Sequence, residues 1–124
     1  MKASEYISKL FEARDIVHMA HLSTKSYSRH KALGSLYETI LEYLDNFVET
    51  YQGQFDLINF DIIHAVPIPD NAIVEYLQAF YGEVLIPAKL EFQSDSVNYG
   101  HYANDLEAFI GDIYHTIYKL RFLE

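Results

Sequence analysis

Apolar side chains recur every three or four residues along most of the chain, which is the spacing of an amphipathic α-helix. In residues 4–22 they are separated by charged side chains. Residues 28–51 carry the longest apolar stripe. The same spacing returns in residues 73–84, until Pro87 kinks or ends the helix, and again in residues 102–122. The pattern predicts an all-α fold with four helices.

Residues that start or stop helices stand beside these segments. Ser26 or Ser28 can cap the second helix, because a serine hydroxyl accepts a hydrogen bond from a free backbone N–H. Gly53 follows the same helix and is a common C-terminal stop. Asp70 is placed to cap the third helix. The second helix is therefore the longest and best bounded of the four.

The connections between the helices differ in length. Residues 54–69 contain a mixed apolar run closed by two prolines, and we expect a long crossover with one short helix. A strand at residues 62–66 is the alternative, although a single strand has nothing to pair with. Residues 93–100 are predicted to be a polar connection. Two helical pairs joined by a long crossover resemble the ferritin-like form of the four-helix bundle.

Length and apolar content indicate one domain over residues 1–124. A chain of this size buries a core without disulfides or metals. The apolar residues come in short groups rather than in a block of about 18, so no membrane-spanning helix is expected. The first residues run directly into the amphipathic pattern and lack the apolar core of a signal peptide. These features predict a cytoplasmic protein that does not interact with membranes.

The composition excludes several kinds of functional site. The chain has no cysteine, which excludes disulfides, thiolate metal sites and cysteine nucleophiles. Its formal net charge is −9, and its nine Lys and Arg residues are scattered, so direct binding of nucleic acid is not expected. An acidic protein suits metal cations, although a solvated acidic surface is the commoner reason for such a charge.

The second helix carries another row of residues beside its apolar stripe. At about 100° per residue these positions fall on one side of the helix. The row consists of His30, Gly34, Glu38, Leu41, Asp45 and Glu49. His30 and Asp45 are separated by about 22 Å along the helix axis, because each residue adds about 1.5 Å. One copy of the helix cannot bring them together.

Two copies of the helix can do so. If two chains pack antiparallel about a two-fold axis near Glu38, His30 of one chain comes level with Asp45 to Glu49 of the other. A site of imidazole and carboxylate groups then forms between subunits. Gly34 would let the two backbones approach closely because it has no side chain. A tolerated helical glycine is the alternative interpretation of that position.

Two further histidines belong to this hypothesis. His21 ends the first helix, and a short turn to an antiparallel second helix places it near His30 in the same chain. His18 lies one turn earlier, and the i, i+3 spacing of His18 and His21 allows them to share a helix face and a metal. Pairs at this spacing are more often packing or surface residues when they stand alone.

The run from His21-Leu22 through His30 to Asp45-Asn46-Phe47-Val48-Glu49 and Gln52-Gly53 resembles the ferroxidase segment of the Dps family. The Dps proteins are the mini-ferritins of the ferritin-like superfamily. The resemblance covers residues 18–53, and a fainter one covers 104–123. At two positions the chain departs from the family pattern, with Leu22 in place of a tryptophan and Gly34 in place of an aspartate.

The resemblance implies a four-helix subunit that assembles as a dimer through the second helix, or as a hollow dodecamer. It further implies that Fe(II) is oxidised by peroxide or oxygen at metal sites between subunits. His21 and His30 would be ligands from one subunit, and Asp45 and Glu49 from its mate, with His18 and Glu38 as weaker candidates. Zinc and manganese also suit this donor set. The alternative is a non-catalytic ferritin-like oligomer that serves as an interaction protein.

Overall fold

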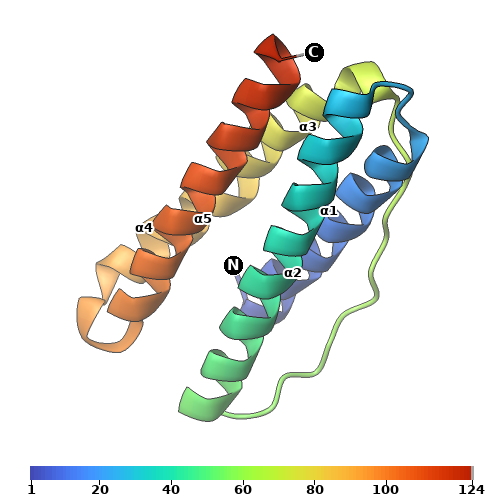
Figure 1. Ribbon diagram of the computed structural model, residues 1–124. Coiled ribbons are helices and arrows are strands. Elements are labelled where there is room, and N and C mark those ends of the chain that lie inside the picture. Colours follow the sequence, from blue (N-terminus) through green and yellow to red (C-terminus); the bar gives the residue numbers. More distant parts are fainter. Residues whose placement is uncertain (124) are drawn as a thin grey trace.

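The computed structural model describes residues 1–123, and within them every regular element is helical (Figure 1). In chain order the helices and helical turns are α1 (Ala3–Ser23), α2 (Tyr27–Gln54), the 3-10 turn η1 (Asp70–Ala72), α3 (Ile73–Phe80), the π turn η2 (Tyr81–Leu85), α4 (Ile86–Ser94) and α5 (Ser96–Phe122). The prediction of an all-α fold is therefore confirmed. None of the helices in the described residues is long and apolar enough to cross a membrane.

The helices form four rods, since α3, η2 and α4 follow one another in a single rod (Figure 1). Helices α1 and α2 form an antiparallel hairpin joined by residues 24–26. The crossover, residues 55–69, then returns along the length of the molecule, so that α3 and α4 run in the same direction as α2 (Figure 1). Helix α5 runs back in contact with α2 and α4. The predicted long crossover between the two helical pairs is thus confirmed.

One hydrophobic core lies between the four rods and takes side chains from each of them. Its fully buried members include Leu10 of α1, Leu36 of α2, Leu77 of α3 and Leu106 of α5. Within each helix the buried side chains recur every three or four residues, which is the repeat that predicts the helices. Burial of each such side chain contributes about 1.5–3 kcal/mol, so the core rather than helix propensity stabilises the rods.

The ends of the helices agree only in part with the capping residues expected from the sequence. The Ser26 hydroxyl accepts a hydrogen bond from the Arg29 N–H at 3.3 Å and caps α2, as predicted. Helix α2 ends at Gln54, one residue past the predicted stop at Gly53, and the Gln54 side chain forms hydrogen bonds with α5. Asp70 does not cap α3. It begins η1 instead, and its carboxylate lies 3.8 Å from the Arg29 guanidinium.

The crossover contains neither the short helix nor the alternative strand considered for residues 62–66, because residues 56–69 form no regular element. Its inward side chains Ile58, Ala65 and Ile68 pack on the core, and Phe60 contacts Phe11 of α1 edge-on. The segment is thus attached to the bundle by side chains.

Two expectations about the second half of the chain differ in outcome. The sequence predicts that Pro87 kinks or ends the third helix, and the structure has the π turn η2 just before it, after which α4 continues the rod. The expected polar connection was wrong. Residues 93–100 are mostly helical, with a break at Asp95 between α4 and α5. The Asp95 carboxylate caps α5 by accepting the Asn98 N–H, and this hydrogen bond and that of the Asn98 side chain lower the pKa of Asp95. Polar residues here form an exposed helix rather than a loop.

Candidate functional site

The candidate site lies where α1 ends and α2 begins. The three-residue connection between the two helices sets them antiparallel, and this brings His21 and His30 into contact. Their imidazole rings stack with centroids 3.8 Å apart and planes inclined by 17°. The expectation that these two histidines meet within one chain is therefore confirmed. Both side chains are half-buried.

Each of the two imidazoles is held by the backbone of the other histidine. His21 Nδ1 lies 2.6 Å from the His30 carbonyl oxygen, and His30 Nδ1 lies 2.8 Å from the His21 carbonyl oxygen. A carbonyl oxygen can only accept, so both Nδ1 atoms carry the hydrogen and donate it. In the neutral rings Nε2 then has a free lone pair. This is the tautomer in which metal-binding histidines are commonly fixed by their surroundings.

The stack extends along the contact between α1 and α2. His18 lies face to face with Tyr37 at 4.1 Å between ring centroids, while His18 and His21 are 6.3 Å apart. Tyr37 also contacts His21 at 5.3 Å. His18 therefore belongs to the same aromatic cluster, but its ring is stacked on a tyrosine.

Gly34 has a defined steric role within the chain. A Cβ atom at this position would lie 2.8 Å from Cε1 and 3.0 Å from Nδ1 of His21. The imidazole of His21 thus occupies the space that any other residue at position 34 would take. The sequence suggested a close approach at Gly34 between two subunits, and the structure uses that space for contact between α1 and α2.

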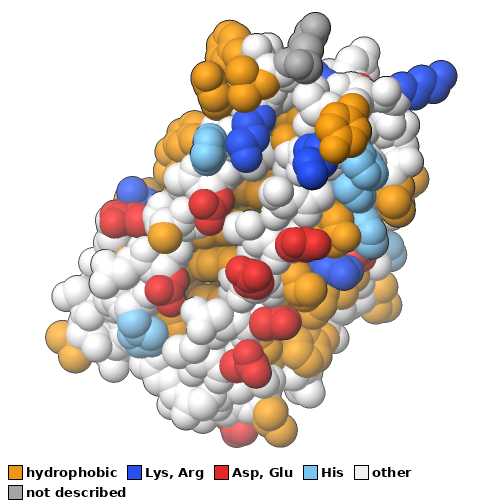
Figure 2. Space-filling model, viewed as in Figure 1, with side chains coloured by type: hydrophobic (Ala, Val, Ile, Leu, Met, Phe, Trp, Pro, Cys, Tyr) orange, Lys and Arg blue, Asp and Glu red, His pale blue; other side chains and the backbone are white. Residues whose placement is uncertain are grey.

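The candidate carboxylates lie elsewhere on α2. Glu38, Asp45 and Glu49 are exposed, and none of them forms an ion pair within residues 1–123. Lys9 and Arg14, which could have neutralised them, pair with Glu12 at 3.5 Å and Asp15 at 3.1 Å. Figure 2 shows the result, with acidic side chains along the face of α2 and histidines near the end of α1.

A single chain does not assemble the predicted ligand set. No group of three or more His, Asp or Glu side chains in the described part of the chain could hold a metal ion. The two histidines and the two carboxylates stay at opposite ends of α2, as their spacing requires. A complete site of this kind needs a second subunit.

From the sequence, Tyr37 is either a redox partner near a metal or a packing residue at the helix margin. In the structure its ring packs against both His18 and His21, a contact that the sequence analysis did not predict. A signal was present, because Tyr37 follows His30 by seven positions and so lies on the same side of the helix.

Comparisons with known proteins show what this chain is similar to. The chain is 42% identical over 52 residues to an uncharacterized 14.6 kDa protein in the mobD-ri intergenic region of Enterobacteria phage T4, which is 42% of this chain and 41% of that protein. The match thus spans less than half the length of this relative. No solved structure matches the chain. Residues 21–120, which begin at His21 and include all four helical rods in whole or part, match a family model, and the chain therefore belongs to the family of unknown function DUF5856.

Proposed function

We propose that this protein is a Dps-like, ferritin-like iron-binding protein whose metal sites are shared between two-fold-related subunits. His21 and His30 of one subunit and Asp45 and Glu49 of its mate bind Fe(II) as substrate. Imidazole and carboxylate ligands suit iron and leave coordination positions open for an oxidant. On this basis the assembled protein oxidises Fe(II) with peroxide or oxygen.

The paired histidines are the observation that carries the proposal. Two imidazoles of one chain have both Nδ1 atoms engaged with backbone carbonyls at 2.6 and 2.8 Å, so only Nε2 is left to bind a metal on each. The surrounding hydrogen bonds fix ring orientation as well as tautomer, which lowers the entropy lost on binding. The donor set of this chain therefore fits iron on the histidine side.

The acidic face of α2 supports the second half of the proposal. Glu38, Asp45 and Glu49 lie exposed along one helix without a cation from their own chain in the described residues. An antiparallel contact about Glu38 sets these carboxylates near the histidines and Lys31 of the mate. Each metal ion would take ligands from both subunits, so metal binding and subunit contact would strengthen one another.

The order of the rods is the other support for a ferritin-like assignment. A hairpin, a long crossover and a second hairpin, with α2 and α3 running in the same direction, are the connectivity of ferritin-like bundles (Figure 1).

A non-catalytic ferritin-like oligomer is the second candidate, and one specific observation favours it. The space at Gly34, where Dps proteins carry a further aspartate, is filled by the His21 ring. The His21–His30 pair is also satisfied by its own hydrogen bonds and stacking, as a structural contact would be. In this case α2 would serve as an interaction surface without iron chemistry.

The direct experiment measures Fe(II) oxidation and bound iron for the native protein and for Asp45→Asn with Glu49→Gln. Both replaced side chains are exposed and keep their size, so the fold should be unchanged. We expect bound iron and the oxidation rate to fall at least tenfold, because each site loses both carboxylates.

The matched control is Glu42→Gln with Glu75→Gln, which removes the same charge from exposed positions outside the proposed ligand set. It should retain iron binding within about twofold. Absence of iron binding by the native protein, or an equal loss in both double variants, would favour the non-catalytic alternative.

A further inference from the structure

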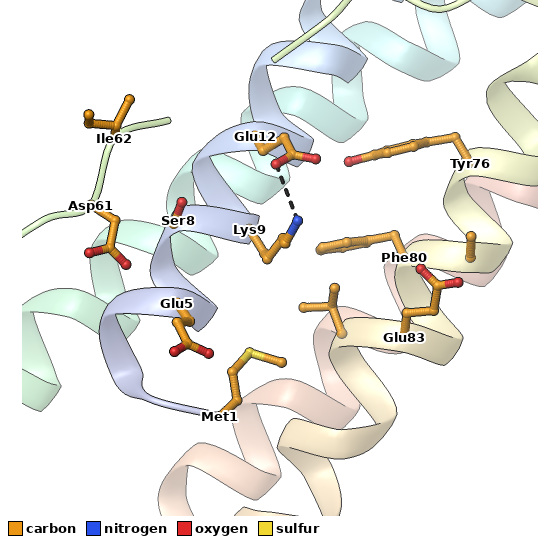
Figure 3. A pocket seen from close by; sticks show the side chains of 12 residues that line it. Met1, Glu5, Ser8, Lys9, Glu12, Asp61, Ile62, Tyr76, Phe80 and Glu83 are labelled. Carbon is orange, nitrogen blue, oxygen red and sulfur yellow. Dashed lines mark ion pairs between the residues drawn. The ribbon is translucent and has the colours of Figure 1, made fainter. Parts of the chain in front are cut away.

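A separate open groove lies between α1, the crossover and the third rod (Figure 3). Its volume is about 470 Å³, which is within the range of small-molecule sites. The side chains that line it come from three parts of the chain that are distant in sequence, namely residues 1–12, 61–62 and 76–84. None of the proposed iron ligands takes part in it.

The third rod supplies an apolar wall. The rings of Tyr76 and Phe80 lie nearly parallel, with planes inclined by 9° and centroids 6.3 Å apart, and Val84 extends this wall. Burial, with the nearby carboxylate of Glu12, raises the pKa of the Tyr76 phenol well above 10.0. Phe80 and Val84 are buried behind the wall, and Tyr76 is partly exposed, so the Tyr76 ring is the one that can pack alkyl groups or attract a cation.

Four carboxylates also line the groove, namely Glu5 and Glu12 of α1, Asp61 of the crossover and Glu83 of η2. Glu12 and Glu83 lie beside the apolar wall, whereas Glu5 and Asp61 lie farther along the groove, with Asp61 across α1 (Figure 3). Lys9 lies in it too, and its ammonium is 3.5 Å from the Glu12 carboxylate. The groove thus already accommodates one alkyl ammonium group from the protein itself.

Three of these carboxylates keep an uncompensated charge. Glu5, Asp61 and Glu83 form no ion pair with any residue from 1 to 123. They are spread along the groove and do not converge, since no three acidic or histidine side chains of the described chain are grouped closely enough for a metal ion. The groove therefore fits a ligand with several separated positive charges better than one compact cation.

The π turn explains how the third rod reaches into this space. Pro87 has no N–H to donate to the carbonyl of Glu83, and the wider turn of Tyr81–Leu85 accommodates that loss. Glu83 and Val84 both belong to this turn, and both line the groove. The π turn, which lacks regular α-helical hydrogen bonds, thus places one charged and one apolar side chain in the wall of the groove.

We propose that the groove binds a linear alkyl polyamine. Its ammonium groups would pair with Glu5, Asp61 and Glu83, while a methylene segment would lie along the partly exposed ring of Tyr76. This ligand class combines separated positive charges with apolar linkers, which is the pattern that the groove presents. The site is independent of the proposed iron chemistry.

Isothermal titration of the native protein with spermidine, a linear triamine, tests this proposal. We expect one saturable site at low ionic strength, with an affinity that decreases as salt screens the carboxylates. Glu5→Gln with Glu83→Gln should weaken binding about tenfold, which corresponds to about 1.4 kcal/mol. Tyr76→Leu should weaken it as well, through loss of the aromatic wall.

The matched control is again Glu42→Gln with Glu75→Gln, which removes the same two negative charges outside the groove and should change the affinity less than about twofold. Circular dichroism confirms that each variant is folded. An equal loss in both double variants would mean diffuse attraction by the acidic protein and would overturn the proposal. So would the absence of a saturable site, or binding of a short lysine peptide with no binding of spermidine.

Discussion

At the scale of single residues, the His21–His30 pair shows how few atoms define the candidate site. Two hydrogen bonds and one ring contact fix both imidazoles where α1 and α2 are joined. The proximity of these residues could be predicted from a short turn between antiparallel helices. Their reciprocal hydrogen bonds could not, because ring orientation depends on the space left by Gly34.

Replacing Gly34 tests that steric argument. Gly34→Ala should lower the free energy of unfolding by about 1 kcal/mol, even though alanine favours a helix, because Cβ would lie 2.8 Å from a ring held by two hydrogen bonds. Gly111→Ala, in α5 with open space around it, should instead gain about 0.5–1 kcal/mol. Urea denaturation measures both.

Removing the ring provides the cross-check. In a His21→Ala background, Gly34→Ala should no longer be destabilising, since the atoms it meets are gone. An equal loss of stability in both backgrounds would mean that the His21 ring is not the cause of the destabilisation.

A buried pair of tyrosines makes stability depend on alkaline pH. The hydroxyls of Tyr6 and Tyr43 are hydrogen-bonded at 2.7 Å inside the core, and burial raises the pKa of both phenols above the ordinary 10.0. The unfolded chain therefore loses these protons at lower pH than the folded protein does. Their contribution to stability is complete below pH 10 and declines above it, by up to about 1.4 kcal/mol per pH unit for each phenol.

Urea unfolding at pH values of about 9 and about 11 measures this decline. Tyr6→Phe with Tyr43→Phe should be less stable at the lower pH but should lose less stability on going to the higher one. Tyr27→Phe, at an exposed position, should behave as the native protein does. The same pH dependence in all three proteins would show that other groups control alkaline unfolding.

At the scale of elements, the apolar repeat predicted the helices well, because it records which side chains the core buries. Where the repeat was weak, polar residues led to the wrong prediction of a connection. Residues 93–100 looked like a connection, but their helix is held by Asp95 as a cap and by Gln54 from α2, a contact across 44 residues of sequence. Long-range contacts of this kind carry no local signal.

Residues that break helices were the more reliable signal. Helix α2 ends one residue past Gly53, and the third rod is interrupted by the π turn beside Pro87 without ending there. At Pro87 the third rod keeps Leu85 and Ala88 in the core by widening one turn, so packing outweighed the local preference.

The cap of α2 gives a prediction at this scale. Ser26→Ala should reduce the free energy of unfolding by about 1 kcal/mol, because the Arg29 N–H loses its acceptor at the helix start. Ser35→Ala, exposed within the same helix, should change it by less than about 0.5 kcal/mol. Thermal denaturation of the two variants measures this difference. Equal midpoints would mean that the Ser26 cap does not contribute to stability.

At the scale of the whole molecule, the bundle separates its chemistry into three regions. The paired histidines lie where α1 and α2 meet, the acidic residues follow the exposed face of α2 (Figure 2), and the separate groove lies between α1, the crossover and the third rod (Figure 3). Within residues 1–123, neither the histidines nor the acids of one chain form a complete metal site. The sequence predicted which residue types could bind a metal and how far apart they lie along α2. It could not predict how the subunits associate, because contacts between chains leave no local pattern in the sequence.

Mixing two inactive variants tests the shared site most directly. One variant carries His21→Ala and His30→Ala, and the other carries Asp45→Asn and Glu49→Gln. Unfolded together and refolded as a mixture, about half of the dimers should contain one chain of each kind, and one of the two sites in each such dimer would have every native ligand. We predict that each variant alone fails to oxidise Fe(II) and that the mixture recovers about a quarter of the native rate. A mixture as inactive as its separate components, although light scattering shows that the two chains have co-assembled, would contradict a site built across subunits.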